Sequence, residues 1–125
     1  MSGRAVLRSY RDLLVWSASV ELAVACYGVT KSFPSNEIYG MTAQVRRAAA
    51  SIAANIAEGY GRDSPGHFQQ FLKVAQGSLK ELETHLIIAS RVGLLGDQSR
   101  EDLLAQCDEI GRMLNALIQK TIART

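Results

Sequence analysis

The chain has 125 residues, of which 47% are hydrophobic and 21% are charged, and its formal net charge is +2. This length and composition fit one globular domain with its own core, and the scarcity of proline and aromatic residues favours helices over strands. No charge-free apolar run is long enough to span a membrane and the N-terminus lacks the apolar segment of a signal peptide, so we expect a cytoplasmic protein.

The positive charge is concentrated at the N-terminus. Residues 1–11 contain three of the 14 basic residues, Arg4, Arg8 and Arg11, and none of the 12 acidic ones. The rest of the chain is therefore slightly acidic, which is weaker than the basic footprint of a dedicated nucleic-acid-binding domain. We divide the sequence into a basic N-terminal arm, residues 1–11, and a single domain, residues 12–125.

The first helix is predicted from about Asp12 to Lys31, and its apolar residues fall on two nearly opposite faces. One face consists of Leu13, Trp16, Val20, Ala23, Val24 and Tyr27, and the other of Val15, Ala18, Leu22, Ala25, Cys26 and Val29. A helix that is apolar on two sides is buried on two sides, so we expect one face in the core and the other against another subunit. The candidate subunit interface is Val15, Ala18, Leu22, Ala25 and Val29.

The second helix is predicted from Tyr39 or Thr42 to Tyr60, with Gly59 and Gly61 ending it. Beside its apolar stripe runs a polar stripe of Arg47, Ser51, Asn55 and Glu58, flanked by alanines. Small residues allow another backbone to approach closely, and buried polar groups need partners. We interpret the polar stripe as a structural network at a packed helix junction, in which Glu58 pairs with an arginine such as Arg47 or Arg62.

Local signals mark the third and fourth helices. Ser64 is a predicted N-cap before Pro65, and the third helix runs to about Val92 with Gly93 as its stop. Ser99 is predicted to cap the fourth helix. Long helices joined by short loops pack antiparallel to their neighbours. The predicted fold is therefore all-α: an up-down-up-down antiparallel four-helix bundle.

No residue pattern indicates catalysis, a metal or a cofactor. Glu81 and His85 have the spacing of helical metal ligands, but the remaining ligands of a di-iron bundle are missing. Cys26 and Cys107 lie in apolar helical patterns and are interpreted as buried, reduced thiols. We interpret the Gly-rich turn at 59–62 as a helix–helix connection rather than a phosphate loop. The chain is predicted not to be an enzyme.

The segment from Arg46 to Arg62 reads R-R-A-x-x-S-I-x-x-N-I-A-E-G-x-G-R. It resembles the signature of a family of four-helix bundle proteins encoded in intervening sequences of bacterial 23S ribosomal RNA. Further matches to the family are the segments 10–16, 31–34, 77–83 and 111–115. The resemblance therefore covers nearly the whole chain.

The resemblance implies a homo-oligomer, in the form of a pentameric ring. A similar fold serves as the accessory variability determinant of diversity-generating retroelements, which implies RNA or DNA and a protein such as a reverse transcriptase as partners. The matched motifs contribute Arg11, Arg46, Arg47 and Arg62 as nucleic-acid-binding candidates, and Arg4 and Arg8 are added for their charge. Two hypotheses remain: a nucleic-acid-binding accessory protein, or a protein-interaction scaffold that binds no nucleic acid.

Overall fold

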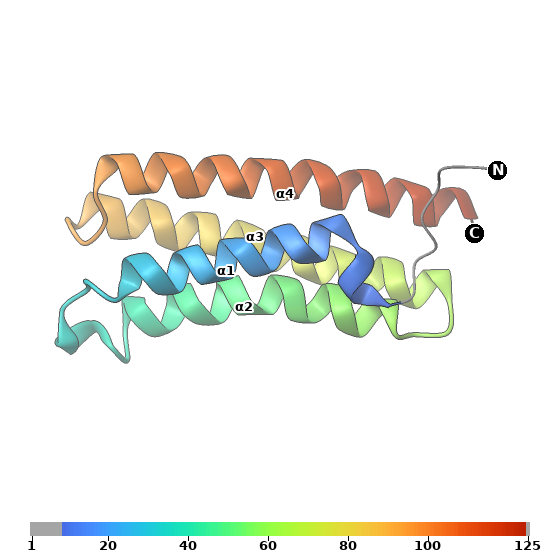
Figure 1. Ribbon diagram of the computed structural model, residues 1–125, viewed down its shortest axis with the longest axis horizontal. Coiled ribbons are helices and arrows are strands. Elements are labelled where there is room, and N and C mark those ends of the chain that lie inside the picture. The colour runs from blue at the N-terminus through green and yellow to red at the C-terminus, as the bar shows by residue number, and fades with distance from the viewer. Residues whose placement is uncertain (1–8, 125) are drawn as a thin grey trace.

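Four helices make up most of the described chain (Figure 1). The computed structural model describes residues 9–124, with side chains as far as residue 122. The helices are α1 (Leu14–Thr30), α2 (Met41–Tyr60), α3 (Pro65–Arg91) and α4 (Asp97–Arg124), and short 3-10 turns, η1 (Tyr10–Asp12) and η2 (Ser35–Glu37), precede α1 and α2. No strand occurs between residues 9 and 124, and the predicted all-α class is confirmed.

The helices pack side by side, so that α1 and α3 each contact both α2 and α4. Figure 1 shows the α1–α2 and α3–α4 connections at one end of the molecule and the α2–α3 connection at the other. The last turn of α1 and the first turns of α2 therefore lie at the same end.

Each helix contributes one apolar stripe to a common core. Leu22, Ile52, Leu79 and Ile110, one from each helix, are almost completely buried. Burying a side chain of this size stabilises the folded state by about 1.5–3 kcal/mol. The core therefore holds all four helices together.

Cys26 on α1 and Cys107 on α4 lie in this core as free thiols, as predicted. Burial raises the pKa of each from 9.0 to about 12, because the thiolate would lose its solvation. In the unfolded chain these thiols ionise near pH 9. Their contribution to stability is therefore fully present below pH 9 and is lost as the pH rises from 9 to about 12.

α1 begins at Leu14, slightly later than predicted, because a separate turn precedes it. Ser9 caps η1: its hydroxyl accepts from the Arg11 amide at 3.1 Å and its amide donates to the Asp12 carboxylate at 3.3 Å. Leu13 then has extended backbone, with ψ at 123°, and this residue separates the turn from the helix.

α3 begins as predicted. The Ser64 hydroxyl accepts a hydrogen bond from the His67 amide at 3.2 Å, and Pro65 is the first helical residue. The helix ends at Arg91, and Gly93 follows with a φ of +85°, a conformation that glycine adopts without a steric penalty.

α4 begins at Asp97, so the prediction that Ser99 caps it is wrong. The Arg100 amide donates to the Gly96 carbonyl at 3.0 Å, which places Ser99 inside the first turn. The carboxylate of Asp97 is favourable at the positive end of the helix dipole. The Arg100 side chain donates to Asp97 at 3.3 Å and to Ser90 on α3 at 3.0 Å, and so ties this turn to α3.

The interface assigned on α1 is wrong for two of its residues. Val15 and Leu22 are 4% and 0% exposed and lie in the bundle's own core, and Ala18, Ala25 and Val29 are half-buried against it. The opposite face is the open one, with Val24 61% exposed and Tyr27 44%. Both apolar faces exist, but periodicity does not determine which of two faces points inward.

Gly59 is a packing residue inside α2, not its terminator. A β-carbon at Gly59 would lie 2.5 Å from the Phe71 Cβ and 3.2 Å from the Phe68 Cδ1, both on α3. The helix continues to Tyr60 and is followed by Gly61 in right-handed backbone. Gly59 therefore permits the short distance between α2 and α3.

We expect Gly59→Ala to lower the free energy of unfolding by about 1–3 kcal/mol, because the added methyl group overlaps Phe71. Gly61→Ala is the matched control, since its β-carbon would meet only ordinary contacts at 3.6 and 3.8 Å. Urea unfolding followed by circular dichroism measures both. Equal stability of the two variants would contradict the packing role of Gly59.

Candidate nucleic-acid interface

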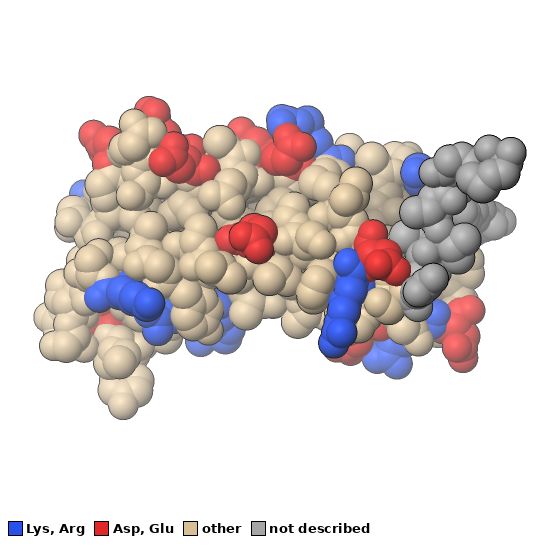
Figure 2. Space-filling view, viewed as in Figure 1, with Lys and Arg blue, Asp and Glu red and all other residues tan. Residues whose placement is uncertain are grey.

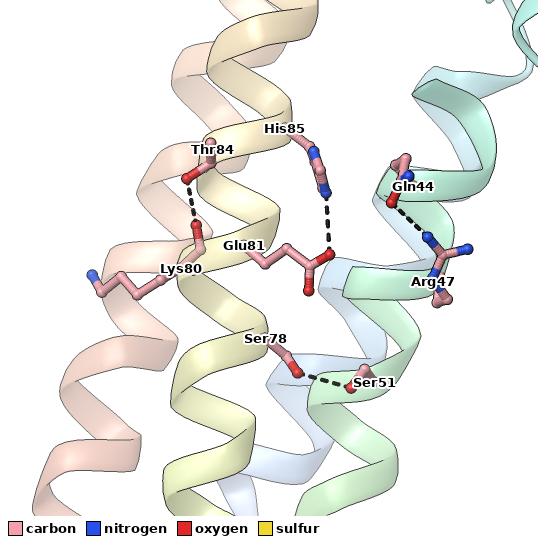
Figure 3. Close-up of polar contacts among 8 residues, drawn as sticks. All are labelled: Gln44, Arg47, Ser51, Ser78, Lys80, Glu81, Thr84 and His85. Carbon is pink, nitrogen blue, oxygen red and sulfur yellow. Dashed lines mark hydrogen bonds and ion pairs between the residues drawn. The ribbon is translucent and has the colours of Figure 1, made fainter. Parts of the chain in front are cut away.

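Ser51 and Asn55 form a polar contact at the junction of α2 and α3. The Ser51 hydroxyl lies 2.8 Å from the Ser78 hydroxyl on α3 (Figure 3). The Asn55 amide donates to the Ser51 carbonyl and hydroxyl at 2.8 and 3.0 Å. All three side chains are partly buried. These two members of the predicted network therefore lie at a packed helix junction, with Ser78 as the partner.

Arg47 and Glu58 lie outside this contact, so the prediction of one four-residue network is wrong for both. Arg47 donates to Gln44 on its own helix, and Glu58 pairs with Arg62 at 3.1 Å. Both residues are exposed, because the helical repeat carries them toward the outer face of α2. The Glu58–Arg62 pair is one of the two pairings anticipated from the sequence.

The six candidate arginines are spread along the molecule. Arg4 and Arg8 lie outside the described residues. Of the others, Arg11 and Arg62 lie at the end with the α2–α3 connection, whereas Arg46 and Arg47 lie in the second turn of α2, near the α1–α2 connection. The structure therefore does not bring these four arginines together.

At the end with the α2–α3 connection, Arg62 has a carboxylate partner and Arg11 adjoins an acidic residue in the sequence. Arg62 pairs with Glu58, and its guanidinium lies over the Phe71 ring at 5.0 Å from the centroid. Arg11 is exposed and directly precedes Asp12. A phosphate at this end would therefore meet carboxylates as well as cations.

Arg46 is held against α1 by two contacts. Its Nε donates to the Thr30 hydroxyl at 2.9 Å, and its guanidinium lies over the Tyr27 ring at 4.6 Å from the centroid. A cation over an aromatic face is attracted by the ring quadrupole. Within residues 9–122, no carboxylate forms an ion pair with Arg46. Its charge is therefore fixed in place but not neutralised.

Lys31 and Arg47 extend this set of cations. Neither forms an ion pair within the described residues. Lys31 follows the last residue of α1, and Arg47 lies on α2 beside Gln44, to which it donates (Figure 3). Residues 27–47 contain these three basic residues and one acidic residue, Glu37. Figure 2 shows basic side chains near the α1–α2 connection and acidic ones along α4.

Sequence reasoning missed the exposed residues of the α1–α2 connection. Tyr39 is 95% exposed and Ile38 is 55% exposed. The signal in the sequence was two large apolar residues between Pro34 and Gly40, in a segment with no helical periodicity to bury them. We call Lys31, Ile38, Tyr39 and Arg46 the loop-end surface.

A shallow apolar groove of about 490 Å³ lies between α1 and α2. Its lining includes Val20, Ala23, Val24, Tyr27, Ala50 and Ala53. Lys31 is the one charged residue of its lining, and Ile38 and Tyr39 are not part of it. The groove therefore has the character of a protein contact and is separate from Tyr39.

Glu81 and His85 form a pair at 3.2 Å on α3 (Figure 3). Within the described part of the chain, no group of three or more His, Cys, Asp or Glu residues is placed to hold a metal ion. Among the same residues, no helix combines the length and the hydropathy needed to cross a membrane.

These observations define a small four-helix bundle protein whose candidate sites lie on its surface. The family model described as 23S rRNA-intervening sequence protein matches residues 11–116, and the chain belongs to this family. It is similar to a solved protein of unknown function from the S23 ribosomal protein family of Bacteroides thetaiotaomicron. That similarity has a TM-score of 0.79 at 26% identity and covers 85% of this chain and 96% of the other. No curated protein matches the chain.

We expect Ser51→Ala and Ser78→Ala to be coupled, because each removes the partner of the other. A double-mutant cycle by urea unfolding should give an interaction free energy of about 0.5–1.5 kcal/mol. Ser64→Ala, which removes the distant α3 cap, is the control and should add independently to Ser51→Ala. If the changes in unfolding free energy for Ser51→Ala and Ser78→Ala simply add, the hydroxyl contact does not stabilise the junction.

Proposed function

We propose that the protein is a non-enzymatic, homo-oligomeric nucleic-acid-binding accessory protein, assembled as a pentameric ring. The observation that carries the proposal is the set of Lys31, Arg46 and Arg47 near one end of the bundle, without an ion pair among the described residues. Such cations suit a phosphate backbone, because their contacts with phosphates release the counterions condensed on the nucleic acid, and this release favours binding. Membership in the 23S rRNA-intervening sequence family is consistent with this proposal.

Arg46 supports the proposal through its geometry. It donates to Thr30 through Nε and to the Tyr27 carbonyl through Nη2, the latter at a long 3.5 Å. Its Nη1 hydrogens have no hydrogen-bond partner among the described residues, and a guanidinium fork suits phosphate oxygens. Because the side chain is already held in place, binding costs less conformational entropy than it would for a free arginine.

The apolar groove between α1 and α2 supports self-association. An exposed apolar surface rimmed by polar residues is typical of protein contacts, and a second copy of the chain is the occupant we propose. Five copies are the assembly that the family resemblance implies. In such a ring the loop-end surface would be repeated on every copy, and several weak phosphate contacts would combine into tight binding.

We expect Arg46→Gln and Arg47→Gln to weaken RNA binding. Each should also reduce the slope of log K against log salt by about one, because one phosphate is no longer neutralised by the protein. Fluorescence anisotropy with labelled RNA, at low and at physiological salt, measures both quantities. Arg112→Gln is the control, because Arg112 lies on α4 and is paired with Glu109 at 3.0 Å.

An absence of binding at low salt would contradict the nucleic-acid proposal. It would leave the alternative, a scaffold for a protein partner, which a pull-down with the wild-type ring then tests. The apolar groove is the surface that such a partner would share with a second copy.

We expect Val24→Asp to dissociate the oligomer, because a carboxylate in an apolar contact costs several kcal/mol. Native mass spectrometry should find five chains in the wild-type assembly and smaller species in the variant. Val74→Asp is the matched control: Val74 is 48% exposed but lies on α3, away from the groove. A monomeric wild type, or an unchanged Val24→Asp assembly, would contradict self-association through this groove.

A further inference from the structure

The α1–α2 connection exposes an aromatic ring although the connection itself is well anchored. Phe33 is buried in the core, and the Glu37 carboxylate accepts from the Met41 amide at 3.0 Å. The Gly40 amide donates to the Glu37 carbonyl at 2.9 Å, which closes a turn around Tyr39. Tyr39 is nevertheless 95% exposed, so both faces of its ring are open. The backbone therefore presents this ring rather than burying it.

The ring lies at the same end of the molecule as Arg46 and Lys31. Tyr39 precedes α2 by two residues, and Arg46 lies about one and a half turns, or roughly 8 Å of helical rise, after the start of α2. Lys31 follows α1, and the hydrogen bond from Arg46 to Thr30 brings the two helix ends together. An aromatic face and two cations without an ion pair among the described residues are therefore within the span of a few nucleotides.

We propose that the loop-end surface binds single-stranded nucleic acid, with an unpaired base stacked on Tyr39 and the neighbouring phosphates on Lys31 and Arg46. The proposal rests on the nucleic-acid-binding function above and specifies its ligand. Bases of a single strand expose faces that stack on aromatic rings, whereas the bases of a duplex are stacked on one another. Tyr39 is not part of the lining of the α1–α2 groove, so the proposed subunit contact through that groove does not require this ring.

An exposed aromatic ring such as Tyr39 could instead contact a second copy of the chain. The charges favour the nucleic acid, because residues 27–47 contain three basic residues and one acidic residue. A partner surface from the same chain would have to neutralise this excess, and Figure 2 shows acidic side chains along α4, at the opposite edge of this face from α2. We therefore treat a subunit contact at Tyr39 as an outcome that the experiment must detect.

The test compares three probes of equal length: an oligothymidylate of about 20 nucleotides, the same backbone with abasic sites, and a duplex. We expect the wild-type assembly to bind the oligothymidylate most tightly. Tyr39→Leu should weaken that binding about tenfold and leave binding to the abasic strand unchanged, because it removes the aromatic face and keeps the apolar bulk. Tyr39→Phe should bind as the wild type does.

Leu14→Ala is the control for exposed apolar bulk, since Leu14 is at the opposite end of α1. Equal binding by Tyr39→Leu and wild type, with Arg46→Gln still weakened, would overturn stacking but keep the nucleic-acid function. An equal weakening on the abasic strand, or a changed assembly mass for Tyr39→Leu, would assign Tyr39 to the fold or to a subunit contact and overturn the proposal. No binding of any of these probes, or of the labelled RNA, at low salt would overturn both.

Discussion

The close packing of α2 on α3 determines which residues of α2 face α1 and solvent, and therefore where the cations of α2 lie. Gly59 has no side chain where Phe71 approaches, and Ser51 meets Ser78 through small hydroxyls. With this flank fixed against α3 and Ile52 in the core, the remaining flank of α2 must face α1 or solvent. Arg46 therefore meets the last turn of α1, where its contacts with Thr30 and Tyr27 hold its charge.

Local chemistry made the start of α3 predictable, and packing made other features unpredictable. The Ser64 hydroxyl accepts from a backbone amide of the first turn, and Pro65 suits the first helical position. The start of α3 therefore needs no residue from elsewhere in the chain. At α4 a serine and an aspartate both suit a helix N-terminus; the helix begins at the aspartate, Asp97, and Ser99 lies within its first turn. On α1 the two apolar faces are nearly equal, so only the packing of the other helices decides that Leu22 points inward.

The candidate site was predictable only in part, for the same reason. Arg46 and Arg47 follow from the motif on α2, and the Glu58–Arg62 pair follows from its spacing of one turn. Tyr39 belongs to a connection, where no periodicity relates a residue to a buried face. The contact between Arg46 and Tyr27 joins residues of different helices. Sequence spacing therefore does not indicate that an aromatic ring, and not a carboxylate, holds this arginine.

A net charge of +2 does not argue against a polyanionic ligand, because charges act over short distances. At physiological salt the field of a charge is screened within about 8 Å, so a phosphate at the loop-end surface responds to Lys31 and Arg46 and hardly to the rest of the chain. Residues 97–120 contain five acidic and three basic residues and would repel a phosphate that approached α4 instead. The uneven distribution thus favours one approach, with the phosphates at the α1–α2 connection and away from α4.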